Sequence, residues 1–100
     1  MLVITKNNFE AEIEKSDKLC VIDLYADWCG PCRMLAPTVH EIADERTDIK
    51  VGKINVDQEP ELAQQYGIMS IPTLIVIKEG NPVAQSTGVR PKQAILDMIG

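Results

Sequence analysis

Two cysteines separated by two residues, Cys29 and Cys32, are the side chains in this sequence best suited to chemistry. They follow an apolar run, "VIDLYADW", and lie where a helix is expected to begin. Residues three apart on a helix have Cβ atoms about 5–6 Å apart, so small rotations bring the two sulfurs to bonding distance. The spacing therefore predicts a pair that can close and reopen a disulfide with little movement of the backbone.

The residues between and around the cysteines favour an ionised outer sulfur. Gly30 removes side-chain bulk beside Cys29, and Pro31 presets φ for the first helical turn, where its missing N–H costs little. Cys29 then lies beside free backbone N–H groups and the positive end of the helix dipole. We expect its pKa to fall below the free value of about 8.5, which makes it the thiolate that attacks disulfides. Cys32, one turn inside the helix, is expected to be more buried and less ionised.

One acid, Asp23, lies near the middle of the apolar run that precedes the cysteines. Burying a charge is expensive unless the charge is paired or the group is protonated. The residues alone leave two interpretations open. Asp23 is either a structural acid that is satisfied by hydrogen bonds or solvent, or an acid that takes part in the chemistry of the pair.

The size and composition of the chain exclude several classes of function. One hundred residues predict a single domain spanning residues 1–100. The net charge of -5 and the scattered basic residues argue against nucleic acid. No apolar stretch approaches the roughly 18–20 residues of a membrane span. The start, "MLVITKNNFE", lacks a secretory signal, so we expect a cytoplasmic protein, where a cysteine pair is more often catalytic or metal-binding than structural.

The hydrophobic pattern predicts strands and helices that form a mixed sheet with helices on both faces. Runs such as "LCVIDLYA" and "PTLIVIKEG" are typical of buried strands. The first helix is expected to begin at Asn7, with Glu10 completing a capping box and with Phe9 and Ile13 on its apolar side. The expected strands are Leu2–Ile4, Leu19–Ala26, Lys50–Val56, Pro72–Gly80 and Val83–Thr87, and the later helices are Cys32–Arg46, Gln58–Gly67 and Pro91–Ile99.

Four separated segments, taken in order, resemble the thioredoxin family. They are "WCGPC" at Trp28–Cys32, "KINVDQEPELAQQYGI" from Lys53, "IPTLIVIKEG" from Ile71, and Gly88. The resemblance covers nearly the whole chain. It implies an α/β protein with the thioredoxin fold, a central mixed five-stranded sheet flanked by four helices.

The resemblance also implies an activity, the reduction of disulfides in partner proteins by dithiol–disulfide exchange through Cys29 and Cys32. Asp23 matches the family's buried aspartate beneath the second cysteine, where desolvation raises its pKa and lets it take the proton of Cys32. Lys53 matches a lysine near that aspartate and is expected to limit the shift. A separate thioredoxin reductase is implied as the electron source, and we expect a monomer without cofactor.

A docking face for the substrate is implied as well. Only about 5–6% of X–Pro bonds in folded proteins are cis, but the family proline that Pro72 matches is cis and packs beside the cysteines. A cis bond there exposes the backbone of Ile71 for pairing with an extended substrate. Two residues depart from the family, because Met69–Ser70 stands where arginine–glycine is common. The expected face is framed by Trp28, Gly30, Pro31, Ile71, Pro72, Gly88 and Val89.

Three other classes of protein were weighed against a reductase. A disulfide isomerase or oxidant usually carries a histidine between its cysteines, whereas this chain has Gly30–Pro31. A redox-independent binding subunit with a thioredoxin fold would not need Cys29, Cys32, Asp23 and Pro72 together. A zinc site is two ligands short, because the chain has one C-x-x-C and no second pair. We therefore expect no metal.

Two further residues were assigned structural roles. Cys20 lies in the expected buried strand, on the same face as Ile22 and Leu24, and is interpreted as an inert small hydrophobe. His40 is the single histidine, near the middle of the long helix, and is interpreted as a surface residue rather than a base or a ligand.

Overall fold

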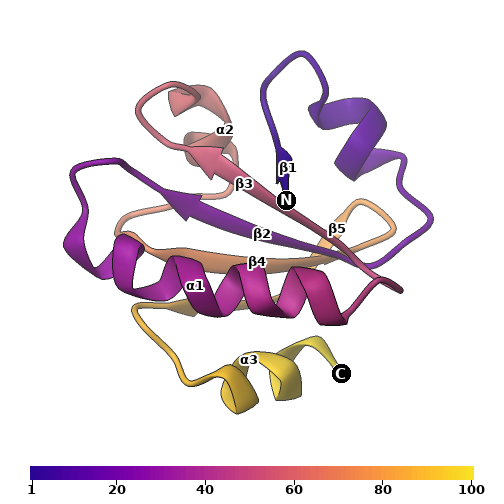
Figure 1. Cartoon of the computed structure of the whole chain (residues 1–100). Coiled ribbons are helices and arrows are strands. Elements are labelled where there is room, and N and C mark those ends of the chain that lie inside the picture. Colours follow the sequence, from indigo (N-terminus) through magenta and orange to yellow (C-terminus); the bar gives the residue numbers. More distant parts are fainter.

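The computed structural model describes residues 1–100 as a five-stranded sheet with helices on both faces (Figure 1). The strand order is β1-β3-β2-β4-β5. Strands β1, β3 and β2 are parallel, β4 is antiparallel to β2, and β5 is antiparallel to β4. The predicted mixed sheet with four helices is confirmed. The elements are β1 Leu2–Val3, η1 Glu10–Glu14, β2 Cys20–Tyr25, α1 Gly30–Glu45, β3 Lys50–Asn55, α2 Pro60–Gln65, β4 Thr73–Lys78, β5 Asn81–Thr87 and α3 Lys92–Ile99.

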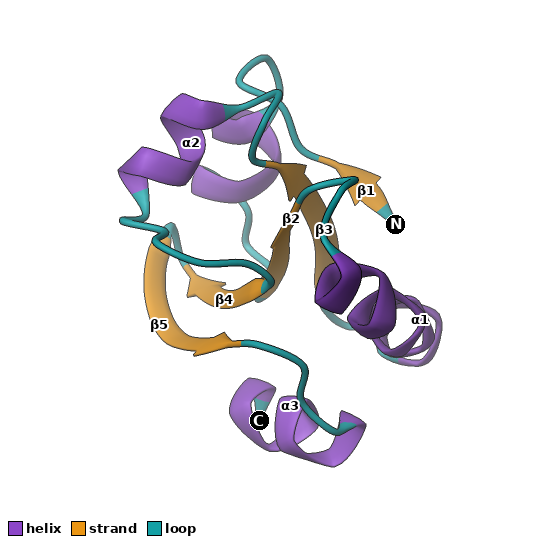
Figure 2. Cartoon of the chain, turned by 90° about the vertical axis from the view of Figure 1, so that its left-hand side faces the viewer, coloured by secondary structure: helices purple, strands orange, loops and turns teal.

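The central strand β2 sends alternate side chains to the two faces of the sheet. Cys20, Ile22 and Leu24 pack into the core that also holds Phe9 and Ile13 from the first helical segment. Figure 2 shows α2 and α1 on opposite sides of the sheet. The predicted apolar side of the first helix and the inert position of Cys20 are therefore confirmed.

The other face of β2 lies under α1 and α3. Val21 packs there with Leu35 of α1, and the alternation of side chains places Asp23 on the same face. In the parallel ladder, Asp23 is the register partner of Lys53 on β3. Both charged side chains are thus held beneath the helix that begins at the cysteine pair.

The first helix is capped by residues other than those predicted. Instead of a capping box at Asn7 and Glu10, Oδ1 of Asn8 accepts a hydrogen bond of 2.8 Å from the backbone N–H of Thr5. Oγ1 of Thr5 in turn accepts one of 3.2 Å from the backbone N–H of Asn7. The prediction was wrong by two residues, because Thr5 and Asn8 carry the same spacing of capping side chains as Asn7 and Glu10.

Strand β5 begins at Asn81, two residues before the predicted start at Val83, and so includes Pro82. A proline lacks the N–H that a central strand needs, but β5 is an edge strand. The register between β4 and β5 also shifts between Val76 and Ile77. The edge position therefore tolerates a residue that the sequence pattern had assigned to the turn.

Candidate active site

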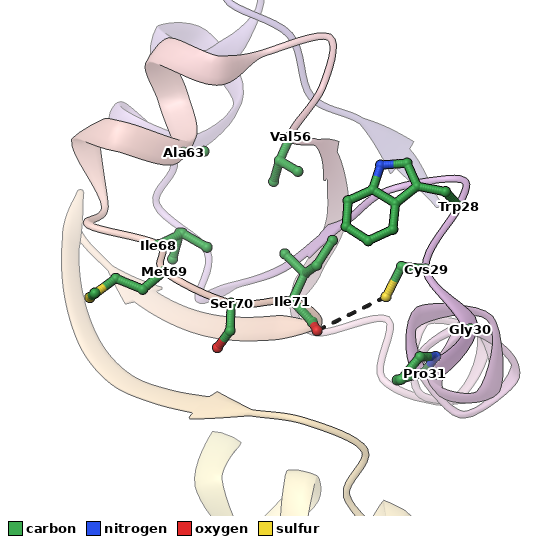
Figure 3. A pocket seen from close by; sticks show the side chains of 10 residues that line it. All are labelled: Trp28, Cys29, Gly30, Pro31, Val56, Ala63, Ile68, Met69, Ser70 and Ile71. Atoms are coloured by element: carbon green, nitrogen blue, oxygen red, sulfur yellow. Dashed lines mark hydrogen bonds between the residues drawn. The ribbon is translucent and has the colours of Figure 1, made fainter.

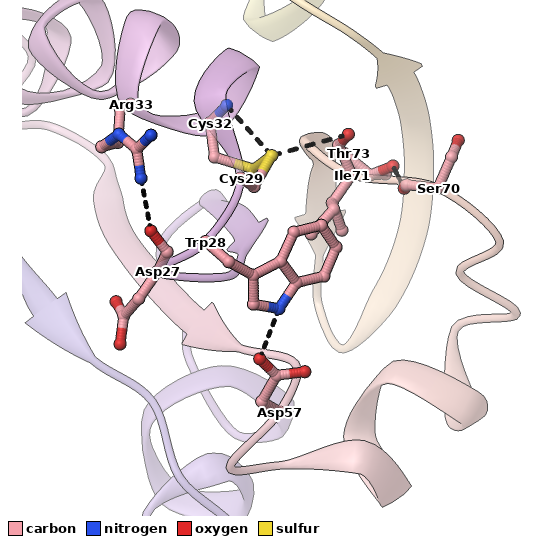
Figure 4. Close-up of a disulfide and its surroundings, with 9 residues drawn as sticks. All are labelled: Asp27, Trp28, Cys29, Cys32, Arg33, Asp57, Ser70, Ile71 and Thr73. Carbon is pink, nitrogen blue, oxygen red and sulfur yellow. Dashed lines mark hydrogen bonds between the residues drawn. A yellow bond between two sulfur atoms is a disulfide. The ribbon is translucent and has the colours of Figure 1, made fainter.

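The cysteine pair lies at the junction between β2 and α1. Cys29 occupies the N-cap of α1 with an extended backbone, and Pro31 lies in the first turn. Sγ of Cys29 accepts a hydrogen bond of 3.2 Å from the backbone N–H of Cys32 (Figure 4). Because the first N–H groups of a helix have no partner within the helix, this sulfur takes the place of a capping oxygen.

Cys29 and Cys32 form a disulfide, and their Cα atoms lie 5.2 Å apart. This separation is within the usual range for disulfides, about 4.4–6.8 Å. The third cysteine, Cys20, is free and buried on the other face of the sheet. The structure thus pairs the two cysteines that their spacing predicted.

The two paired cysteines differ in their surroundings more than in their burial. Their exposed fractions are 4% for Cys29 and 3% for Cys32, so the expectation that Cys32 is clearly more buried is wrong. The outer sulfur is covered because it packs against the segment before β4, 4.0 Å from the carbonyl oxygen of Ile71. Cys29 lines an outer groove, whereas Cys32 lines an inner cavity.

The segment opposite the cysteines contains the predicted cis peptide bond, between Ile71 and Pro72. Figure 3 shows the carbonyl of Ile71 directed toward the sulfur of Cys29. The backbone N–H of Gly88 donates a hydrogen bond of 2.8 Å to the carbonyl of Pro72. Gly88 therefore adjoins the proline, and the following residue, Val89, is exposed.

An open, mostly apolar groove of about 550 Å³ lies beside the outer cysteine (Figure 3). Four of the predicted docking residues line it, whereas Pro72, Gly88 and Val89 lie outside its lining. The lining residues are Trp28, Cys29, Gly30, Pro31, Val56, Ala63, Ile68, Met69, Ser70 and Ile71.

The wall of this groove opposite the cysteines was missed by the sequence reasoning. Val56 follows β3, Ala63 lies on α2, and Ile68 follows that helix. Met69, which the sequence marked only as a departure from the family, is 98% exposed. All these residues lie within or next to a segment that resembles the family, but which of them face the groove depends on how α2 packs on the sheet.

Trp28 is held at the rim of the groove by a residue that the sequence reasoning missed. Its side chain is 69% exposed, and its Nε1–H donates a hydrogen bond of 2.8 Å to Oδ2 of Asp57 (Figure 4). Asp57 lies in the loop after β3. A polar partner at one edge of an indole leaves its apolar face free for contact.

Asp23 lies on the inner side of the pair. It is 4% exposed and, together with Cys32 and Lys53, lines a cavity of about 180 Å³. Its Oδ1 accepts no hydrogen bond from the protein. Burial raises the pKa of Asp23 from 3.8 to about 6, and the positive charge of Lys53 partly offsets this rise. Both predicted effects on this pKa are confirmed.

The structure contains no group of three or more His, Cys, Asp or Glu side chains that could hold a metal ion. None of its helices combines the length and apolar character that crossing a membrane requires. The chemistry on view is therefore that of the sulfur pair. With one sulfur beside an open groove and the other above a buried acid, the fold and the site define a thiol–disulfide oxidoreductase.

Comparisons with known proteins agree with this class. The thioredoxin family model matches residues 1–100. The chain is 47% identical over 95 residues to thioredoxin of Alicyclobacillus acidocaldarius, covering 94% of this chain and 90% of the relative. It is 49% identical over 92 residues to thioredoxin 2 of Chlorobaculum tepidum, covering 91% and 84%. With thioredoxin of Bacillus subtilis it shares 40% identity over 100 residues, covering 99% and 96%.

The chain belongs to the thioredoxin family. It is a protein-disulfide reductase that acts by dithiol–disulfide exchange through Cys29 and Cys32.

Proposed function

We propose that Cys29 is the attacking sulfur and Cys32 the resolving sulfur of this exchange. The Cys29 thiolate attacks a substrate disulfide, bonds to one substrate sulfur and releases the other as a thiolate. Cys32 then attacks Cys29, which breaks the mixed disulfide and releases the second substrate sulfur. Two electrons thus pass from the pair to the substrate. The observation that carries this order is that Cys29 lines the outer groove and Cys32 does not.

Asp23 is proposed as the acceptor of the Cys32 proton. A thiol becomes an effective nucleophile when a nearby base removes its proton. Asp23 and Cys32 line the same cavity, and a carboxyl with a pKa of about 6 is partly poised to take a proton near neutrality. Lys53 is assigned the task of limiting this pKa, because its charge favours the ionised carboxylate.

The outer groove is proposed as the docking face for an extended segment of a disulfide-containing protein. The apolar side chains of Trp28 and Pro31 and the open space at Gly30 form the side next to the reactive sulfur. The backbone of Ile71 is proposed to pair with the substrate main chain. Pro72, buried behind Ile71, supports that backbone.

Gly88 and Val89 are proposed to extend this face beyond the groove itself. The hydrogen bond from Gly88 to Pro72 keeps the loop after β5 against the docking segment. The exposed side chain of Val89 offers a further apolar contact for a substrate.

Regeneration of the dithiol requires two electrons from another protein, which we assign to a thioredoxin reductase. A pair that must be reduced again after each turnover fits a reducing compartment, so we place the protein in the cytoplasm. We assign the working form to a monomer, since a docking groove is of use only when it is free to bind a substrate.

Single-serine variants test the proposed order of attack. With insulin as the disulfide substrate, Cys29→Ser should abolish reduction, and Cys32→Ser should accumulate a mixed disulfide between Cys29 and the substrate on a non-reducing gel. Cys20→Ser is the matched control and should do neither, because Cys20 is buried away from the pair. A trapped adduct with Cys29→Ser, and none with Cys32→Ser, would reverse the assignment.

A further inference from the structure

The inner cavity connects the buried Asp23 with an exposed histidine, His40. Both residues line this space of about 180 Å³, which is large enough for several water molecules. Oδ1 of Asp23 has no hydrogen-bond partner in the protein. Because buried polar atoms need a partner, water in the cavity is the group that can serve this oxygen.

One face of α1 covers the cavity. Cys32, Ala36 and His40 all line it, and their spacing of four residues puts them in one row on the helix. From the rise of an α-helix, Cys32 and His40 are about 12 Å apart along the axis. The single methyl group of Ala36 between them leaves room for water. His40 is exposed, as the sequence suggested, but it also lies at the rim of the cavity that holds the buried acid.

We propose that His40 transfers protons between the water of this cavity and bulk solvent during turnover. The proposal rests on the proposed role of Asp23. When Cys32 attacks Cys29, the proton of the Cys32 thiol passes to the Asp23 carboxylate. That proton must leave before the next cycle, and His40 accepts it through cavity water and releases it to solvent. The substrate thiolates take up protons from solvent, so the protons balance.

Other ionisable residues face the same cavity from the elements around it. Among side-chain types, imidazole is the one whose charge changes between pH 5 and 8 without perturbation. This makes the histidine the lining side chain best suited to exchange protons with water near neutral pH. Besides Asp23, Cys32 and His40, the ionisable lining residues are Tyr25, Asp27, Arg33, Lys53 and the N-terminal Met1.

Chemical rescue tests the proposal with the full chain. The reduced protein is mixed with insulin at concentrations where the first exchange no longer limits the rate, in dilute buffer at constant ionic strength, and oxidation is followed by Trp28 fluorescence. His40→Ala should slow oxidation by about 3- to 10-fold, at the low end of what proton transfer contributes. Added imidazole should restore the rate.

The matched control is Asp44→Asn, on the same helix four residues after His40, exposed and outside the cavity lining. It and the wild type should be fast and insensitive to imidazole. A wild-type rate for His40→Ala in dilute buffer would overturn the proposal. So would a slow His40→Ala that imidazole does not restore, since that result marks a structural or purely electrostatic role.

Asp23→Asn, measured in parallel, separates this proposal from the one on which it rests. An unchanged rate for Asp23→Asn would refute the role of Asp23, and the relay would fall with it. A slow Asp23→Asn together with a normal His40→Ala would refute the relay alone.

Discussion

The backbone N–H of Cys32 donates a hydrogen bond to Sγ of Cys29 over 3.2 Å, across the first turn of α1. Hydrogen bonds to an ionised acceptor are roughly twice as strong as those between neutral groups. When the disulfide is opened, the same donor therefore favours the thiolate of Cys29, and the helix dipole acts in the same direction. This relationship makes the sulfur beside the groove the reactive one.

Replacing Asp23 by alanine is expected to stabilise the fold at neutral pH. The pKa of Asp23 is about 6 in the folded protein and 3.8 as a free side chain. The unfolded chain therefore loses this proton first, and the free energy of unfolding falls as pH rises from 3.8 to about 6. The difference in pKa corresponds to at most about 3 kcal/mol. Above this range Asp23→Ala should gain up to that amount, reduced by its lost packing.

Urea unfolding across this pH range provides the measurement. The two proteins should have similar pH-independent stability below pH 3.8 and diverge above it. Asp44→Ala, at an exposed position of α1, is the control and should not change the shape of the pH curve. Parallel curves for wild type and Asp23→Ala would contradict the raised pKa.

Removing the carboxylate of Asp57 is expected to weaken substrate docking without slowing the chemistry. Asp57 accepts the hydrogen bond of the Trp28 indole, and a net hydrogen bond contributes about 0.5–1.5 kcal/mol. Asp57→Ala should therefore raise KM for insulin by about 2- to 10-fold and leave kcat nearly unchanged. Steady-state kinetics with the reductant in excess give both constants.

Two further variants decide whether this effect comes from the hydrogen bond. Asp57→Asn keeps an acceptor oxygen and should restore most of the affinity, and Gln58→Ala, at the exposed neighbouring position, should behave like the wild type. A loss of kcat at constant KM would assign Asp57 to the chemistry instead.

The reduction potential distinguishes a reductase from an isomerase or oxidant. Thioredoxins have potentials near about −270 mV, whereas disulfide isomerases and oxidants lie at about −180 to −120 mV. With Gly30 and Pro31 between its cysteines, this pair is expected in the thioredoxin range. Equilibration with glutathione buffers, followed by alkylation of free thiols, measures it. A value in the higher range would favour the isomerase or oxidant.

The sheet could be predicted from the sequence because its strands are marked by local patterns. Alternation along Cys20–Tyr25 determines which side chains share a face, and no distant contact is needed to see it. The cap of the first helix could not be predicted, because two overlapping pairs of polar residues satisfy the same spacing. Nδ2 of Asn8 also donates a hydrogen bond of 2.9 Å to the carbonyl of Val3, a contact that favours the earlier pair.

The candidate site divides along the same line. The two cysteines and Asp23 could be found because they lie within ten residues of each other around one strand–helix junction. Asp57 could not, since its contact with Trp28 joins residues 29 positions apart. His40 did carry a signal, two turns after Cys32 on one helix face. That signal gains meaning only from the cavity beneath α1.

The central claim is that the start of α1 holds the sulfur of Cys29 as a thiolate. The most direct test is the pKa of Cys29 in the reduced protein, obtained from the pH dependence of its alkylation rate, with the modified residue identified by mass spectrometry. The account predicts a pKa at least about one unit below the free-cysteine value of about 8.5. A pKa at or above that value would contradict it.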